Sequence, residues 1–395
     1  MEHAYDYLIL GAGMAASAAA RGIRQRDERG SIALLGAEPH PPYDRPPLTK
    51  DLWNGKKQLE EIWRDIESAR ATLFPGRHAL GVDPRAKSVR DDHGDHYRYG
   101  KLLIATGGTP RRIPGLAGDR VIYYRTLDDY HALRDALREG MHVAVIGGGF
   151  IGSEIAAALA MNGARVTQLI AEDAIGARVY PQGLARFITD YYRDKGVDVR
   201  CGARVTGGSA SDEGVTLQLE GGASLESEWA IAGLGITPNV QLAHEAGLRV
   251  DNGIIVDAQL RTSHADIWAA GDVANYPDAT LGTRRRVEHE DAALTMGEHA
   301  GAGMAGAHAP YTHLPYFYSD LFELGYEALG ELDVRLQTVE DWKQPNREGV
   351  VYYLDSGRVR GVLLWNVWDQ KDNARALIGE DGPHDAQSLR GRLPA

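Results

Sequence analysis

The feature that most constrains this chain is a glycine motif placed where a strand gives way to a helix. The apolar run Tyr7–Leu10 predicts the strand, and Gly11–Ala16 follows with the pattern G-x-G-x-x-A ahead of an alanine-rich helix. Small residues at such a turn let the backbone approach a pyrophosphate, which the helix N-terminus then stabilises. The next predicted strand, Ser31–Leu35, ends close to Glu38, where such folds place a carboxylate on ribose hydroxyls. We predict a dinucleotide site here; the alternative is an ordinary strand–helix turn.

A second motif of the same kind lies in the middle of the chain. Residues His142–Ile146 predict a strand, and Gly147–Gly152 follows with the full pattern G-x-G-x-x-G and a helix. The strand Arg165–Ile170 then leads to Glu172. A carboxylate at this place hydrogen-bonds a free ribose 2′-OH and repels a 2′-phosphate, which favours NADH over NADPH. Arg178 lies nearby and weakens that preference, and a solvated loop acid is the alternative role for Glu172.

Two motifs of this kind predict two dinucleotides in one chain. A flavin and a nicotinamide form the economical pair, because a flavin accepts a hydride from a nicotinamide and holds it. We therefore predict an α/β fold in which the protein places FAD and NADH face to face. A chain of 395 residues is long enough for two or three domains.

Three stretches outside the motifs suit contact with a cofactor. The proline-rich segment Pro39–Lys50 predicts a stiff loop, neither helix nor central strand, that holds Arg45 and Lys50 against an anionic group; a solvated surface loop is the alternative. A short strand over Lys101–Ile104 closes on Ala-Thr-Gly. A later strand closes on Gly-Asp, so Asp272 is expected at a sheet edge, where it accepts hydrogen bonds from ribityl hydroxyls, caps a helix, or does both.

The remaining segments carry weaker signals. Residues 57–100 are charged, and we expect irregular structure there. The run Arg284–Arg286 is either a solvated loop or a docking patch, and both interpretations stay open. A C-terminal part begins at Tyr311, with a hairpin turn at Asp355–Gly357. Asp372 is expected to cap a short helix.

Composition excludes several classes of protein. The formal net charge of −12 argues against broad nucleic-acid binding, and no apolar run reaches the roughly 18 residues of a membrane span. The N-terminus enters a strand within a few residues, so we expect no signal peptide and a cytoplasmic location. The single cysteine, Cys201, cannot form an intramolecular disulfide, and no metal site is predicted.

The ordered set of motifs resembles the flavin-dependent pyridine-nucleotide oxidoreductases. The matching stretches are 11–13, 42–50, 105–107, 147–154 and 270–272. The resemblance implies a glutathione-reductase-like architecture, with two Rossmann-like dinucleotide-binding domains and a smaller α+β C-terminal domain. The implied boundaries are 1–112 and 238–310 for FAD, 113–237 for NAD, and 311–395 for the C-terminal domain.

The absence of a redox cysteine pair narrows the resemblance to one branch. Without such a pair, the chain lacks the groups needed for the disulfide chemistry of glutathione reductase or thioredoxin reductase. What remains is similar to the ferredoxin and rubredoxin reductases, together with apoptosis-inducing factor, which the second half resembles most. The family usually has tryptophan where Tyr318 stands, and the long insertion in the C-terminal domain of the animal factor is missing.

By the same resemblance, Lys50 lies near flavin N5 and pairs with Glu154, and these two are the predicted catalytic residues. A lysine there stabilises an electron-rich flavin, and a carboxylate keeps it charged. The predicted FAD-binding residues are Gly11, Gly13, Ala15, Ala16, Glu38, Arg45, Lys50, Ala105, Thr106, Gly107, Asp272, Glu288, His289 and Tyr318. The predicted NAD-binding residues are Gly147, Gly149, Phe150, Ile151, Gly152, Glu154, Glu172, Arg178 and Gly235.

The favoured function is electron transfer from NADH through FAD to a ferredoxin- or rubredoxin-like protein. A basic rim would dock this acidic partner. Its candidate residues are Lys56, Lys57, Arg111, Arg112 and Arg284–Arg286. One alternative is an NADH-responsive flavoprotein like apoptosis-inducing factor, which forms a stable charge-transfer complex and switches its association state. Another is an NADH oxidase or quinone reductase, and a monomer and a homodimer are both compatible with the sequence.

Overall fold

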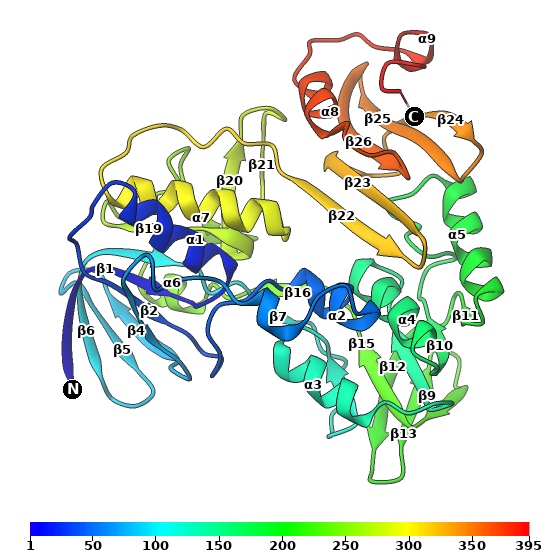
Figure 1. The fold of residues 1–395 in the computed structure, drawn as a ribbon, viewed down its shortest axis with the longest axis horizontal. Helices are drawn as coiled ribbons and strands as arrows, with labels where there is room; N and C mark the ends of the chain where they lie inside the picture. The colour runs from blue at the N-terminus through cyan, green and yellow to red at the C-terminus, as the bar shows by residue number, and fades with distance from the viewer. Residues whose placement is uncertain (395) are drawn as a thin grey trace. The chain divides into compact units, whose positions relative to one another are not determined.

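The computed structural model describes residues 1–394, which pack into two compact units built from segments far apart in the sequence (Figure 1). The first unit comprises residues 1–45, 59–109 and 237–315. The second comprises residues 46–58, 110–236 and the chain from 316 onward. Each unit contains one of the two glycine motifs, so the two predicted dinucleotide sites belong to different units. This division into two units does not test the three domain boundaries that the family resemblance implies, and those boundaries stay a prediction.

The first unit is built around a seven-stranded sheet with the order β3-β2-β1-β6-β5-β4 and with β19 beside β6. At its centre, Leu8–Leu10 of β1 run parallel to Ala33–Leu35 of β2 and to Leu102–Ile104 of β6. These residues are buried and apolar, which is the pattern of parallel strands covered on both faces. The strands are β1 (Glu2–Leu10), β2 (Ile32–Leu35), β3 (Ala71–Phe74), β4 (Ala79–Asp83), β5 (Ser88–Asp91), β6 (His96–Ile104) and β19 (Ile267–Ala269).

Two helices of this unit, α1 (Met14–Arg24) and α7 (Glu290–Met304), lie against each other (Figure 1). Their approach is so close that it requires glycine: a Cβ atom added to Gly301 would lie 2.1 Å from the carbonyl oxygen of Ala19. The remaining elements of the unit are α6 (Gln241–Glu245), the 3₁₀ turns η2 (Leu59–Ile62) and η3 (Gly271–Val273), and the small sheet β17 (Val250–Asp251), β18 (Gly253–Ile255), β20 (Ala274–Asp278) and β21 (Thr283–Arg285).

The second unit contains a five-stranded parallel sheet with the order β11-β10-β9-β15-β8. Its central strand β9 (His142–Ile146) leads directly into helix α4 (Phe150–Met161), which is the predicted second motif. The other elements here are β8 (Val121–Tyr123), α3 (Leu127–Ala136), β10 (Arg165–Leu169), α5 (Gln182–Asp194), β11 (Asp198–Arg200), β15 (Trp229–Ala232) and the antiparallel sheet β12 (Val205–Ala210), β13 (Val215–Leu219) and β14 (Ser224–Ser227).

The same unit carries a five-stranded antiparallel sheet with the order β22-β23-β26-β25-β24, which places β22 at one edge. The predicted hairpin turn at Asp355–Gly357 joins β25 and β26, which are the fourth and third members of this sheet. The elements are β22 (Tyr316–Leu321), β23 (Leu324–Gly330), β24 (Gln337–Gln344), β25 (Glu348–Asp355), β26 (Arg358–Trp365), α8 (Lys371–Ile378) and α9 (Ala386–Leu389), with η1 (Pro46–Leu48) and α2 (Asp51–Asn54) from the proline-rich segment. Strands β7 (Gly108–Pro110) and β16 (Ile236–Pro238) pair where the chain passes between the units.

Three local expectations are wrong. Residues 57–100 are not irregular: they contain β3, β4, β5 and the start of β6, in which buried Tyr97 and Tyr99 alternate with exposed polar residues. The proline-rich segment does contain a helical turn, Pro46–Leu48, because proline is tolerated in the first turn of a helix. Asp372 does not cap α8: it lies within the first turn and pairs with Arg375 at 2.6 Å.

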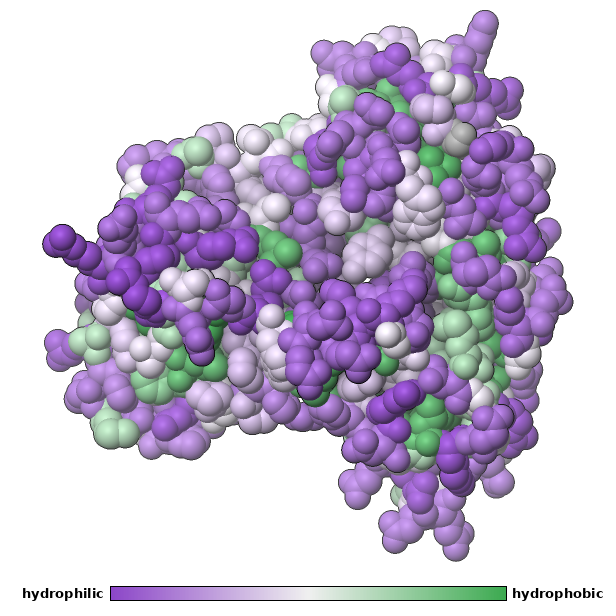
Figure 2. Space-filling model, viewed as in Figure 1, coloured by the Kyte–Doolittle hydropathy of each residue, from purple (hydrophilic) through white to green (hydrophobic). Residues whose placement is uncertain are grey.

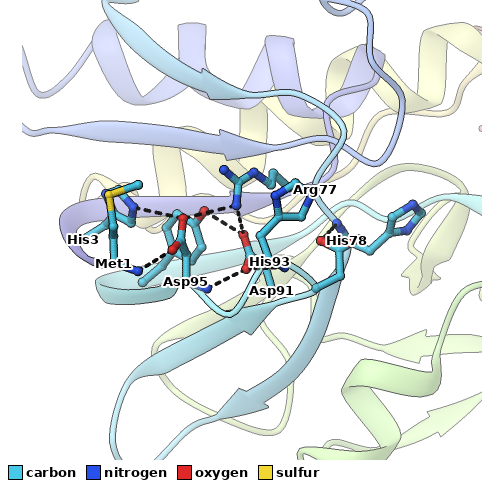
Figure 3. Close-up of polar contacts among 9 residues, drawn as sticks. Met1, His3, Arg77, His78, Asp91, His93 and Asp95 are labelled. Carbon is cyan, nitrogen blue, oxygen red and sulfur yellow. Dashed lines mark hydrogen bonds and ion pairs between the residues drawn. The ribbon is translucent and has the colours of Figure 1, made fainter.

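A polar cluster supports the hairpin that leads into β6 (Figure 3). The Asp91 carboxylate is fully buried, yet it accepts hydrogen bonds from the backbone of His93 and Asp95, from the Tyr97 hydroxyl and from Arg77. Burial raises the pKa of the Asp91 carboxyl, but these hydrogen bonds outweigh it and hold the pKa below its ordinary value. Arg77 also pairs with Asp95 at 3.1 Å, so one guanidinium joins both carboxylates.

The surface is mainly polar on the face drawn in Figure 2, where apolar side chains form scattered patches. Exposed large apolar side chains include those of Met161 and Trp368, each about half exposed. Across residues 1–394, no helix has both the length and the apolar character that a membrane crossing requires.

Replacing Gly301 with alanine is expected to destabilise the first unit. Its Cβ would meet backbone, which cannot move aside, and such overpacking costs about 1–3 kcal/mol. This exceeds the roughly 1 kcal/mol by which alanine improves helix propensity. Thermal unfolding should show a Tm several degrees lower. Gly81→Ala is the matched control, because its Cβ would meet nothing within 4 Å; equal Tm values for the two variants would contradict the close contact.

Candidate dinucleotide sites and the Lys50–Glu154 pair

The first glycine turn has a backbone that other residues do not readily adopt. Gly11 has φ of +119°, and a Cβ atom there would lie 2.3 Å from the carbonyl oxygen of Ala105. The N–H of Gly11 donates to the carbonyl of Leu35 at 2.7 Å. The turn therefore sits where the carboxyl ends of β1, β2 and β6 meet, which is the ligand-binding edge of an open parallel sheet.

The position of Gly13 leaves room for a ligand in front of helix α1. Gly13 is the residue before the first turn of the helix, and a Cβ added to it would meet no atom within 4 Å. The first N–H groups of an α-helix have no partner within the helix and attract anions. An open space at the start of α1 therefore fits the pyrophosphate of a dinucleotide.

The second glycine turn repeats this geometry in the second unit. Gly147 also has φ of +119°, and its Cβ would lie 2.5 Å from the carbonyl oxygen of Gly233. A Cβ on Gly152 would lie 2.4 Å from the carbonyl oxygen of Gly147. Gly149 again faces open space at the start of a helix, here α4. The two turns have the same backbone geometry, and each fits a dinucleotide.

Glu38 and Arg45, both predicted at the first site, contact each other. The Glu38 carboxylate pairs with the Arg45 guanidinium at 2.5 Å and accepts a hydrogen bond from the Tyr43 hydroxyl at 2.5 Å. Arg45 also lies over the Tyr43 ring, 5.1 Å from its centroid. Sequence reasoning missed Tyr43, although its place in the matched loop was visible. The three side chains form one polar group shortly after the carboxyl end of β2, the strand that meets the first glycine turn.

Asp272 lies near His289 in the first unit, and its carboxylate acts to raise the pKa of that imidazole. Asp272 lies in the turn after β19, and His289 immediately precedes α7. Burial, together with the nearby Arg285 guanidinium, lowers the pKa of His289 to about 4, so its imidazole is neutral at pH 7. The residue that caps η3 is Ala270, which removes the helix-cap alternative for Asp272.

The arginine run is bound to its own unit, which neither earlier interpretation anticipated. Arg284 donates to the carbonyls of Val256 and Asn275 at 2.8 and 2.6 Å. Arg285 pairs with the buried Asp278 at 3.4 Å. Arg286 is almost fully buried; it pairs with Glu288 at 2.7 Å and donates to the Asp272 carbonyl at 3.0 Å. These guanidinium groups hold the loop before α7 in place.

The predicted pair of Lys50 and Glu154 is present and buried. The Lys50 Nζ lies 2.7 Å from Glu154 Oε1, and the two side chains are 7% and 3% exposed. Two hydroxyl groups complete the surroundings of the carboxylate: Thr49 donates to Oε2 and Ser319 donates to Oε1, both at 2.6 Å. Three donors therefore satisfy a carboxylate that would be costly to bury alone.

The ring of Tyr318 lies beside the same lysine. The Lys50 Nζ is 5.1 Å from the ring centroid, which is within the range of a cation–π contact. Neither Thr49 nor Ser319 was among the predicted site residues. Thr49 directly precedes the predicted residue Lys50, and Ser319 directly follows the predicted residue Tyr318. The long-range contact of each hydroxyl with Glu154, however, has no local sequence signal.

The other predicted residues take up positions around the two turns. Glu172 pairs with the exposed Arg178 at 2.5 Å. The carboxylate predicted to favour NADH over NADPH is therefore in contact with the arginine predicted to weaken that preference. Thr106 donates to the carbonyl of Asn239 at 3.0 Å. The Phe150 and Phe317 rings lie 5.3 Å apart. Ala15 and Ala16 are buried in α1, Ile151 is partly exposed, and Gly107 and Gly235 have positive φ.

Comparisons with known proteins agree with this geometry. Residues 5–297 match the pyridine nucleotide-disulphide oxidoreductase family, and residues 300–348 match the C-terminal model of mitochondrion-associated apoptosis-inducing factor. Mitochondrial apoptosis-inducing factor 1 of Dictyostelium discoideum is 33% identical, covering 96% of this chain and 80% of its own. The ferredoxin–NAD(+) reductase component of the anthranilate 1,2-dioxygenase system of Burkholderia cepacia is 33% identical, covering 97% and 96%.

A solved structure shows the same fold. The crystal structure of the covalent putidaredoxin reductase–putidaredoxin complex superposes with a TM-score of 0.88 at 30% identity, covering 94% of this chain and 92% of that chain. The fold and the paired turns thus define an α/β oxidoreductase that binds two dinucleotides. The chain belongs to the pyridine nucleotide-disulphide oxidoreductase family, and its cofactors are FAD and NAD(H). With Cys201 as its one cysteine, it has no redox disulfide within the chain.

Replacing Lys50 with methionine is expected to destabilise the second unit, because it leaves the Glu154 charge buried without its cation. Removing one partner of a buried ion pair costs about 3–5 kcal/mol. Lys50→Met/Glu154→Gln removes both charges and should recover part of this loss. Urea unfolding of cofactor-free protein measures both variants. If the single variant is as stable as the unchanged protein, the pair is not closed in solution.

Proposed function

We propose that the protein is an NADH-dependent flavoprotein reductase that passes electrons to a small ferredoxin- or rubredoxin-like protein. The observation that carries this proposal is the buried Lys50–Glu154 pair in a chain with two dinucleotide turns and no disulfide. Bound FAD would supply the chemistry that converts a two-electron hydride donor into a source of single electrons. Catalysis by this chain then consists of binding, positioning and charge stabilisation.

The proposed roles combine the geometry of the two glycine turns and the ion pair with the family resemblance. The turn at Gly11–Ala16 would hold the FAD pyrophosphate, and the turn at Gly147–Gly152 would hold NADH. Lys50 would stabilise negative charge on the flavin ring, because an ammonium in a dry site interacts strongly with an anion. Glu154, fixed by the Thr49 and Ser319 hydroxyls, holds the Lys50 ammonium in place. The proposed domains are 1–112 with 238–310, 113–237, and 311–395.

The proposed electron acceptor follows from relatives whose names state one. Besides the anthranilate dioxygenase component, the rubredoxin–NAD(+) reductase of Pseudomonas putida is 34% identical, covering 82% of this chain and 86% of its own. Arg285 and Arg286 are partly buried and ion-paired, so the remaining candidates for a basic docking rim are Lys56, Lys57, Arg111, Arg112 and the exposed Arg284. Arg112 lies 4.8 Å from the centre of the Tyr123 ring, and Lys56 is exposed. We propose a cytoplasmic location.

A second candidate function is supported by the C-terminal match. Residues 300–348 match the C-terminal part of apoptosis-inducing factor, so a slow NADH-responsive flavoprotein is the alternative. It would form a persistent charge-transfer complex and change its association state instead of reducing a ferredoxin quickly.

Anaerobic stopped-flow mixing distinguishes these two functions. The FAD-loaded protein is mixed with NADH and then with a panel of ferredoxins and rubredoxins. We expect rapid bleaching of the flavin followed by fast reoxidation by one member of the panel. A slow bleaching with a long-wavelength band that survives every acceptor would reject the reductase and favour the alternative.

Replacing Glu172 with alanine is expected to raise the KM for NADH about tenfold, because one charge-assisted hydrogen bond to the ribose is worth roughly 1.5 kcal/mol. The variant should use NADPH better than the unchanged protein, since a repulsive carboxylate is gone while Arg178 stays. Steady-state kinetics with both coenzymes tests this, and FAD content is the control. Unchanged NADH kinetics would remove Glu172 from the ribose site.

A further inference from the structure

A hollow of about 240 Å³ opens onto the buried ion pair within the second unit. Its lining includes Lys50 and Glu154, which are almost fully buried, and Lys56, Met161 and Trp368, which are exposed. The hollow therefore runs from the buried pair to the protein surface. Its walls are polar enough and it is large enough to admit several water molecules.

Asp320 lies in the wall of this hollow with its carboxylate uncommitted. It is half-buried, and among residues 1–394 no group hydrogen-bonds to its carboxylate or forms a salt bridge with it. It comes directly after Ser319, whose hydroxyl donates to Glu154, on the edge strand β22. Elsewhere in the chain, half-buried carboxylates are paired, as Asp44 and Glu38 are at 22% and 27% exposure.

The chemistry of the proposed function requires a route for a proton. A hydride carries one proton and two electrons, so the balanced reaction is NADH + 2 oxidised acceptors → NAD⁺ + H⁺ + 2 reduced acceptors. Each turnover therefore releases one proton. The Lys50–Glu154 pair is the titratable group proposed to lie at the reaction site, and the hollow joins it to the surface.

We propose that Asp320 is a proton-relay residue that connects the Lys50–Glu154 pair with bulk water through this hollow. The proposal rests on the proposed function. An N–H bond of the Lys50 ammonium breaks as a proton passes, through water in the hollow, to the Asp320 carboxylate, where an O–H bond forms. Lys50 recovers its third proton from the one that the reaction releases. The O–H bond at Asp320 then breaks and the proton leaves to solvent, so no charge accumulates.

The charges around Asp320 suit a group that gains and loses a proton. Burial raises the pKa of the Asp320 carboxyl, and the nearby Glu154 and Asp51 charges act in the same direction. Lys50 and Lys56 act in the opposite direction and keep the charged form accessible.

The other acid in the wall, Glu323, is unsuited to the same task. Its carboxylate pairs with Lys195 at 2.9 Å and is 59% exposed. The nearby Tyr191 hydroxyl and the paired Lys195 lower the pKa of Glu323 to about 2, so it stays ionised near neutral pH. It is therefore the matched control for Asp320.

The test uses ferricyanide, a one-electron acceptor that needs no protein docking. The FAD-loaded protein is reduced with one equivalent of NADH and mixed with ferricyanide in a weakly buffered indicator dye, which reports proton release. We expect Asp320→Asn to slow proton release and flavin reoxidation at least tenfold while reduction by NADH, which releases no proton, keeps its rate. Asp320→Glu should restore most of the rate, and Glu323→Gln should match the unchanged protein. Proton release at the normal rate in Asp320→Asn overturns the relay.

A second measurement needs neither cofactor nor turnover. Cofactor-free protein labelled with ¹³C at aspartate carboxyl carbons is titrated by NMR, and the resonance missing from Asp320→Asn identifies the group. A pKa above that of ordinary surface aspartates, about 3.9, is expected, and an ordinary value overturns the proposal. The two proposals fail separately: normal ferricyanide chemistry without reduction of any ferredoxin or rubredoxin rejects the acceptor, whereas normal proton release in Asp320→Asn rejects only the relay.

Discussion

The burial of one charged pair governs the organisation of the second unit. Lys50 and Glu154 lose nearly all their hydration, and Coulomb attraction alone does not offset that loss in a protein interior. The Thr49 and Ser319 hydroxyls supply the missing hydrogen bonds. Because these groups come from a proline-rich segment, a helix after a glycine turn and an edge strand, the pair fixes three elements with respect to one another.

Close backbone approach is the second constraint, and it was readable from the sequence. Gly11 and Gly147 are needed where a strand end meets a neighbouring carbonyl, and the flanking apolar runs have the length of buried strands. The sequence therefore predicted both strand–turn–helix motifs and their family. By contrast, β3, β4 and β5 are only four or five residues long and lie among charged loop residues, so too few positions were present to show an alternation. A pattern that depends on one buried face is harder to recognise at a polar sheet edge.

The contacts that complete the candidate site could not be predicted in this way. Thr49, Glu154 and Ser319 are separated by more than a hundred residues at each step, and a hydroxyl has no periodicity that reveals its partner. The ion pairs of Arg285 and Arg286 were hidden for the same reason, since a run of arginines is typical of an exposed surface. Local patterns predict elements, whereas the satisfaction of buried charges depends on the tertiary fold.

The long separation of these partners also has a consequence for biosynthesis. The Ser319 hydroxyl reaches a carboxylate made 165 residues earlier, so helix α4 must wait for strand β22 before Glu154 is fully satisfied. During translation at about 5–20 residues per second, this gap lasts roughly ten to thirty seconds. Throughout that time the nascent chain contains Glu154 without its Ser319 hydrogen bond. Chaperones therefore have an interval of this length in which to bind the unfinished second unit.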